Sequence, residues 1–143
     1  MSEIASAPKQ SASSGSPMNV VIAKRSDSRF VEGRRAFFKY CDLGVTEATG
    51  GKMRAELTSA SQGLSQPTGW HYHLCEVQFV YMLSGWVDLE FEGRGMIRVE
   101  AGDSIMIPGG LRHQEVKTSE SFEMLEVSLP AKMGTETCEP PTV

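Results

Sequence analysis

Short apolar runs punctuated by glycine fill the middle of this chain, and none of them has a long helical period. In residues 86–91, Val87, Leu89 and Phe91 alternate with other side chains, which is the period of a strand with one buried face. Residues 77–83 are dense in valine, phenylalanine, tyrosine and methionine, which predicts a strand buried on both faces. The expected strands cover residues 19–23, 36–40, 52–58, 69–73, 77–83, 86–91, 96–99, 104–107, 114–116 and 122–129.

The strand expected at residues 52–58 alternates Met53, Ala55 and Leu57 with charged side chains, so it is predicted to be half-buried. Between two strands, Ser84-Gly85 predicts a tight hairpin, and the Gly-Arg-Gly at residues 93–95 predicts a turn. About ten short strands at regular spacing are typical of an all-β sandwich or barrel.

Length and composition fit one folded domain. The chain has 143 residues, of which 40% are hydrophobic, so it can bury a core without a disulfide scaffold. Residues 1–17 are rich in serine, alanine and proline and lack the apolar core of a signal peptide, which predicts a disordered leader. We expect the barrel to span residues 18–132 and residues 133–143 to form a flexible tail.

Charge and cysteine usage exclude several classes of function. The net charge of −4 argues against a nucleic-acid partner, because phosphate binding needs a basic stripe. No apolar run approaches the roughly 20 residues that span a bilayer, so no membrane partner is expected. The cysteines, Cys41, Cys75 and Cys138, contain no CxxC pair and indicate neither a disulfide framework nor a thiolate zinc site. A reducing cytoplasm is the expected setting.

All three histidines of the chain lie in two short segments. His71 and His73 are two residues apart on an expected strand, so both rings leave the same face. His113 follows Pro108-Gly109-Gly110, a turn signal, where a paired strand would begin. Because imidazole is the commonest protein ligand of transition metals, these residues predict one shared metal site.

The same two segments carry the motifs of a known family. Residues 102–113 match G-x5-PxG-x2-H at each defined position, and residues 69–85 match most of G-x5-HxH-x4-E-x6-G. The pair of motifs resembles that of the cupin superfamily. Gln78 replaces the usual glutamate, and the opening glycine, expected near position 65, is displaced. The resemblance implies a double-stranded β-helix, a small jelly-roll barrel with the metal inside one mouth.

The resemblance also implies that His71, His73, Gln78 and His113 bind one divalent ion. An amide oxygen can coordinate a metal but brings no charge, so an ion held by this set keeps its full positive charge and favours an anionic ligand. Glu76 is a rival carboxylate, but its position fits neither spacing, and we expect it to be exposed.

Which other side chains line the interior is open at this stage, since a one-residue slip exchanges the two faces of a strand. Cys75 has no basic neighbour placed to lower its pKa, and a structural thiol is expected there. The candidate lining residues are Met53, Arg54, Phe79, Tyr81, Met106, Met124 and Glu126.

Four protein ligands leave one or two positions open on a five- or six-coordinate ion, which is typical of catalytic metals. Some cupins that act on sugar acids and polyketides carry this His-His-Gln-His set. The resemblance therefore implies an enzyme whose metal acts as a Lewis acid in the isomerisation, cyclisation or elimination of a small organic acid.

The alternatives are an iron or copper dioxygenase, and a non-catalytic barrel that binds a small ligand. The ion is Zn, Fe, Ni, Cu or Mn, and the sequence assigns no catalytic residue. Small cupins generally pair, and the aromatic-rich strands carry more apolar surface than one barrel covers, so we expect a homodimer.

Overall fold

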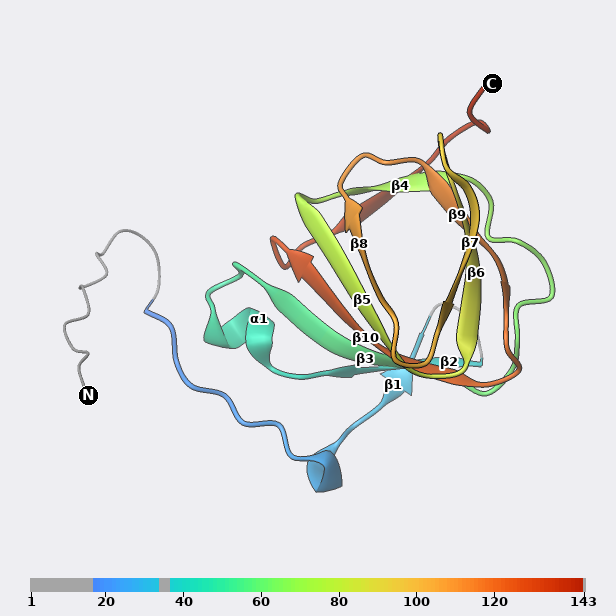
Figure 1. The fold of residues 1–143 in the computed structure, drawn as a ribbon. Coiled ribbons are helices and arrows are strands. Elements are labelled where there is room, and N and C mark those ends of the chain that lie inside the picture. Colours follow the sequence, from blue (N-terminus) through green and yellow to red (C-terminus); the bar gives the residue numbers. More distant parts are fainter. Residues whose placement is uncertain (1–16, 34–36, 143) are drawn as a thin grey trace.

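The described residues of the computed structural model, 17–33 and 37–142, form two antiparallel sheets that face each other around a shared interior (Figure 1). The six-stranded sheet has the order β1-β2-β3-β10-β5-β8, and the five-stranded sheet has the order β11-β4-β9-β6-β7. The elements are η1 (Arg25–Asp27), β1 (Val31–Glu32), β2 (Phe38–Asp42), α1 (Val45–Ala48), β3 (Arg54–Ala60), β4 (His71–Leu74), β5 (Val77–Ser84), β6 (Trp86–Phe91), β7 (Gly95–Glu100), β8 (Ser104–Pro108), β9 (His113–Thr118), β10 (Phe122–Leu129) and β11 (Gly134–Thr137).

This arrangement confirms the expected all-β jelly-roll fold. Sequence-distant strands are neighbours, as when β10 lies between β3 and β5. The expected strands at residues 86–91 and 122–129 have the bounds observed for β6 and β10. The expected turn at residues 93–95 joins β6 to β7 in an antiparallel pair.

The hairpin predicted at Ser84-Gly85 is wrong, because the chain changes sheets there. Strand β5 pairs with β10 and β8, whereas β6 pairs with β7 and β9. Gly85 has a φ of 76°, and a Cβ atom at this position would lie 2.5 Å from the carbonyl oxygen of Ser121. Glycine therefore serves a tight corner between the sheets.

Two burial patterns also differ from the prediction. On β5 only alternate residues are buried, and Tyr81 and Leu83 on the outer face are 38% and 45% exposed, so this strand is not buried on both faces. On β3, by contrast, buried residues lie on both faces: Ala55 on one and Thr58 on the other. The charged side chains of β3 face the interior, which a half-buried strand with an apolar inner face would not allow.

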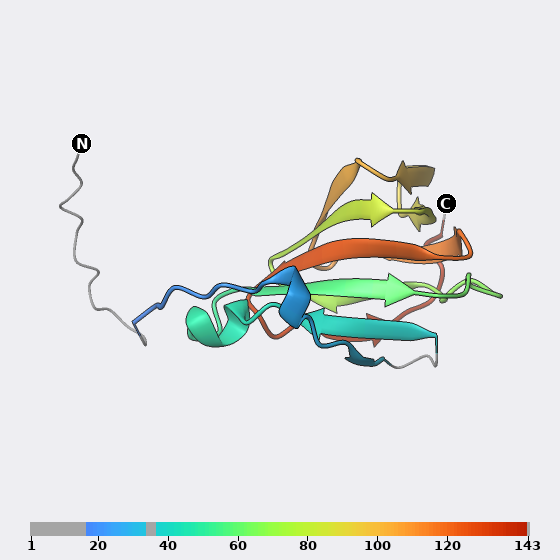
Figure 2. The same cartoon turned by 90° about the horizontal axis from the view of Figure 1, so that it is seen from below.

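The first and last strands of the barrel also differ from the prediction. Residues 19–23 form no strand and have no neighbouring strand to pair with, and Val20 is 89% exposed. Figure 2 shows this segment running outside the sheets. At the other end, β11 lies beyond residue 132, where the barrel was expected to end, and pairs with β4. Residues 1–16 of the expected leader, and Ala36 of the strand expected at 36–40, lie outside the described residues.

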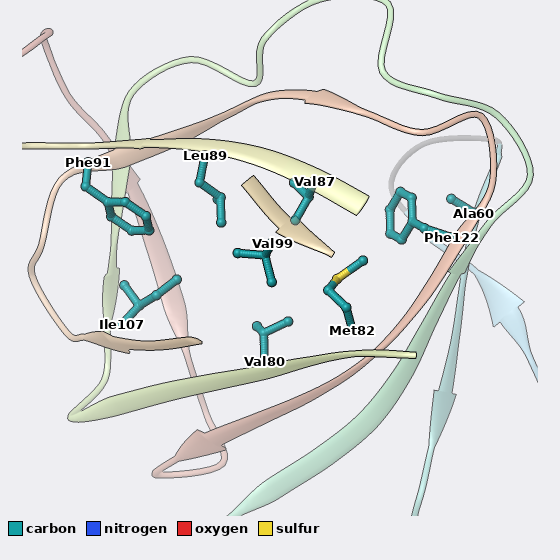
Figure 3. Packing of buried hydrophobic residues seen from close by; sticks show 9 residues of the cluster. All are labelled: Ala60, Val80, Met82, Val87, Leu89, Phe91, Val99, Ile107 and Phe122. Carbon is teal, nitrogen blue, oxygen red and sulfur yellow. The ribbon is translucent and has the colours of Figure 1, made fainter. Parts of the chain in front are cut away.

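The apolar core fills one part of the space between the sheets. Figure 3 shows side chains from both sheets pointing toward one another, with Val80 and Met82 of β5 opposite Val87 and Leu89 of β6. Met82 is 0% exposed. In the described part of the chain, no helix has the length and apolar character needed to cross a membrane.

Candidate metal centre

The three histidines meet inside the barrel, as the sequence predicted. His71 on β4 lies directly across from His113 on β9, where the two residues are Cα partners in the antiparallel pair. The ring centroids are 4.6 Å apart for His71 and His113, and 5.2 Å for His73 with either of the others. One ligand nitrogen from each ring lies within 4.8 Å of the other two.

Hydrogen bonds orient each ring through its Nδ1 atom. Nδ1 of His71 donates to the carbonyl oxygen of Gly69 over 2.7 Å, and Nδ1 of His113 donates to that of Leu111 over 2.9 Å. Nδ1 of His73 is 2.9 Å from Oγ1 of Thr135. Donation from Nδ1 leaves the lone pair on Nε2, and Nε2 of His113 is buried with no hydrogen-bond partner among the described residues. This tautomer is the one that binds a metal through Nε2.

Two of the rings, those of His73 and His113, are also held neutral. Burial, together with the neighbouring His113 and His71, lowers the pKa of His73 to about 4. Burial likewise lowers the pKa of His113, against the raising effect of its hydrogen bond to Leu111 and of the Glu115 carboxylate. Neutral imidazole is the form that ligates a metal, so His73 and His113 are ready to bind an ion near neutral pH.

A close backbone approach joins the two histidine segments. The amide N–H of Gly109 donates to the carbonyl of Glu76, and that of Gly110 donates to the carbonyl of His73. A Cβ atom on Gly109 would lie 1.5 Å from the carbonyl oxygen of Cys75, so no side chain fits at this position. The turn that precedes His113 is therefore fastened to the turn that follows His73.

Gln78 lines the same cavity from β5 and is 7% exposed. Its Nε2 donates to Oε2 of Glu126 over 2.5 Å, while its Oε1 is buried with no hydrogen-bond partner among the described residues. Burial raises the pKa of Glu126, although the nearby Arg54 and the bond from Gln78 act in the opposite direction. This buried amide oxygen has no hydrogen-bond partner among the described residues, and an amide oxygen can serve as a ligand of a divalent ion.

Glu115 is a carboxylate near the histidines that the sequence analysis missed. Its two oxygens lie 3.7 Å from Nε2 of His71 and 3.8 Å from Nε2 of His113. It stands two residues after His113 on β9, and this same-face spacing was a signal that could have found it. Thr135 was missed because residues 133–143 were expected to be a tail.

The expectations for Glu76 and Cys75 agree with the structure, whereas those for the lining residues agree only in part. Glu76 is exposed in the turn between β4 and β5, as expected. Burial raises the pKa of the Cys75 thiol, which favours the expected unreactive form. Of the candidate lining residues, Arg54, Met124 and Glu126 line the cavity, whereas Tyr81 and Met106 are 38% and 55% exposed.

The cavity that contains the site has a volume of about 570 Å³, within the range of small-molecule sites. Its wall combines polar residues with apolar residues of the core such as Val87, Leu89 and Ile107. Its charged lining residues are Arg54, Glu56, Glu115 and Glu126. Arg54 is engaged by its neighbours: Nη1 contacts Glu56 at 2.5 Å, and Nη2 lies 3.7 Å from Glu126.

These donors fit a divalent transition metal. Three convergent imidazoles could hold the ion, and their Nδ1 partners supply the outer shell that usually orients such ligands. An ion bound by three rings and one amide oxygen would have an open position toward the cavity.

Comparison with known proteins agrees with this picture. Residues 61–128 match the family model described as "Cupin domain". The polyketide cyclase RemF from Streptomyces resistomycificus is similar in structure, with a TM-score of 0.67 and 19% identity, over 86% of this chain and 88% of that one. KdgF from Halomonas sp. has a TM-score of 0.62 and 17% identity, over 80% and 96%.

A larger neighbour is the salicylate 1,2-dioxygenase from Pseudaminobacter salicylatoxidans. Its TM-score is 0.58 at 15% identity, and the match covers 74% of this chain but only 32% of that chain. No curated protein gave a significant sequence match. The matched family model places a cupin domain at residues 61–128, and the jelly-roll fold and the clustered histidines agree with the resemblance to the cupin superfamily.

Proposed function

We propose that the protein binds one divalent metal ion through His71, His73, His113 and Gln78, and acts on a small organic acid. The observation that carries the proposal is the convergence of three histidine rings whose Nδ1 atoms already have hydrogen-bond partners. When bound, the ion supplies a Lewis acid for isomerisation, cyclisation or elimination. Its identity is one of Zn, Fe, Ni, Cu and Mn.

The charges around the cavity support an anion that binds at the ion itself. Gln78 brings no charge to the ion, whereas a glutamate would partly neutralise it. Among the described residues that line the cavity, Arg54 is the only lysine or arginine, and it is paired with Glu56 and Glu126. Since the remaining charged lining residues are carboxylates, the metal would be the centre that attracts a carboxylate or enolate. The polyketide cyclase RemF is a similarly folded protein with a related class of activity.

A calorimetric titration with a panel of small carboxylic and hydroxy acids tests this function. We expect the metal-loaded protein to bind at least one acid, and the metal-free protein to bind none of them measurably. An acid that binds the two forms equally well would contradict a role for the ion. Binding without conversion of any acid would favour the non-catalytic alternative.

A dioxygenase is the second candidate, because cupins with three histidine ligands also activate oxygen. The structural similarity to a salicylate 1,2-dioxygenase favours it, although the chain covers only 32% of that protein. The two functions are distinguished by elemental analysis of protein from its native host, followed by oxygen-uptake measurements. Zinc without oxygen uptake supports the Lewis-acid enzyme, whereas iron or copper with substrate-dependent uptake supports the dioxygenase.

We also propose that the protein is a homodimer. The neighbouring strands β5 and β8 expose apolar side chains on their outer face, where Leu83 and Met106 are 45% and 55% exposed. An exposed apolar patch of this kind is typical of an interface. Sedimentation at micromolar concentration is expected to give twice the monomer mass, and a monomer alone would contradict the proposal.

A further inference from the structure

Glu126 lies next to Gln78 on the inner face of the six-stranded sheet. Strand β10 runs between β5 and β3, with Ser128 opposite both Gln78 and Arg54, and Glu126 opposite Val80 and Glu56. The neighbouring residues Gln78 and Glu126 are 7% and 8% exposed. Their contact, from Nε2 to Oε2 at 2.5 Å, is a hydrogen bond shielded from water.

This bond gives the amide a direction. A glutamine side chain has a donating end and an accepting end, and only the oxygen can bind a metal. Because Glu126 accepts a hydrogen bond from the NH₂ group of Gln78, the amide oxygen is the end left toward the cavity. This oxygen has no hydrogen-bond partner among the described residues. Glu126 is itself placed by Arg54, whose Nη2 is 3.7 Å from Oε2 and whose Nε donates to Oγ of Ser128.

The same contact explains the departure from the usual motif at position 78. A glutamate there would have no N–H to donate and would set two acceptor groups against each other in a buried space. We propose that Glu126 is the positioning residue for Gln78: it aims the amide oxygen at the metal, and it is the reason that this chain has an amide where the motif usually has a carboxylate. The inference rests on the proposed ligand role of Gln78.

We predict that Glu126→Gln changes metal affinity in opposite directions, depending on whether residue 78 is glutamine or glutamate. With Gln78 present, Glu126→Gln leaves the amide without a unique direction, and we expect metal affinity to fall about 10–100-fold, as for other outer-shell partners. In a Gln78→Glu background, the same Glu126→Gln substitution supplies an N–H to the new carboxylate. There we expect it to raise metal affinity by at least about tenfold, since it replaces a repulsive contact by a hydrogen bond.

The experiment measures Co²⁺ and Zn²⁺ affinity by chelator competition for the wild type, E126Q, Q78E and the double variant, together with the visible spectrum of the Co²⁺ forms. Glu56→Gln is the matched control, because it removes the same charge beside Arg54 without touching Gln78. We expect its affinity to stay within about threefold of the wild type. Glu126→Met removes the acceptor altogether, and with Gln78 present it is expected to weaken binding as E126Q does.

A change in the same direction for E126Q in both backgrounds would overturn the inference, as would an E126Q effect no larger than that of E56Q. Circular dichroism of every metal-free variant checks that the barrel has formed, and affinities are compared only among folded variants. A failure of the proposed function looks different, because His71→Ala and His113→Ala would then leave metal binding intact. If those substitutions abolish metal binding, but Glu126→Gln changes metal affinity in the same direction in both backgrounds, only the positioning role of Glu126 is overturned.

Discussion

The two ends of the barrel interior are built from the same strands but have opposite chemistry. Along the inner face of β5, the polar Gln78 lies at one end and the apolar Met82 at the other. On the neighbouring strand β10, Glu126 lies at the polar end and Phe122 at the apolar end. The change from polar to apolar residues occurs at the same level on neighbouring strands, because antiparallel pairing places Phe122 opposite Ala60 of β3 at the apolar end. One end is therefore mostly apolar, and the other contains the cluster of buried polar groups.

The difference between the ends indicates a division of labour. The apolar end buries side chains from both sheets and supplies the hydrophobic stabilisation. The polar end contains buried atoms without hydrogen-bond partners in the described structure, Oε1 of Gln78 and Nε2 of His113 among them. Such groups destabilise a fold unless a ligand satisfies them, which is the physical reason to assign the metal to this end.

The largest expected effect on stability lies at the apolar end. Met82→Ala removes a side chain that is 0% exposed, and the cavity it leaves should reduce the free energy of unfolding by about 2–5 kcal/mol. Urea denaturation measures the loss. Metal affinity of the folded variant should remain close to that of the wild type, and a large loss of affinity would mean that the two ends are not separable.

Gly109→Ala should affect both ends of the comparison at once. The added Cβ would lie 1.5 Å from the carbonyl oxygen of Cys75, so the two turns that carry the histidine segments must separate. We expect a loss of about 1–3 kcal/mol in unfolding free energy, together with weaker metal binding. Metal affinity measured by chelator competition and stability measured in urea should fall together. Unchanged metal affinity would show that this contact does not position the histidines.

Thr135→Val should weaken the metal site with little effect on stability. It removes the hydroxyl 2.9 Å from Nδ1 of His73, and we expect about a tenfold loss of metal affinity. Thr137→Val is the matched control, because Thr137 lies on the same strand opposite His71, whose Nδ1 donates to Gly69 instead. Equal effects of the two substitutions would assign the loss to β11 in general rather than to the bond to His73.

The smallest expected effect is on a surface pair outside both ends. Hydrogen bonds from Arg98 lower the pKa of Asp88 below its ordinary value of 3.8. The stability from this pair is therefore fully present above that value and is lost as the pH falls through the lowered pKa. Asp88→Asn should cost about 0.2–1 kcal/mol near neutral pH and nothing at the acid end. Urea denaturation at several pH values measures this, and a loss that persists in acid would contradict it.

Much of the candidate metal centre could be predicted because its histidines lie in two short segments with local sequence signals. Two-residue spacing places His71 and His73 on one face whatever the rest of the fold does. The turn before His113 was readable from proline and glycine alone. The partners of these ligands were not readable, since Glu126 and Thr135 come from strands whose register depends on pairing with distant segments.

The errors in the fold have a similar origin. A Ser-Gly step marks a tight turn, but it does not say whether the next strand stays in the same sheet, and at Gly85 it does not. Charged residues on β3 look like a solvent face in the sequence, yet Arg54 and Glu56 line the interior cavity. Residues 19–23 have strand-forming side chains without a partner strand, and local propensity alone forms no sheet.

The most direct test of the central claim is the metal content of the purified protein. Elemental analysis should find close to one divalent transition metal ion per chain in the wild type. The double substitution His71→Ala and His113→Ala removes two of the three convergent rings, and it should abolish binding while the apolar end keeps the barrel folded. Full metal occupancy in that double variant would contradict the assignment of the polar end as a metal centre.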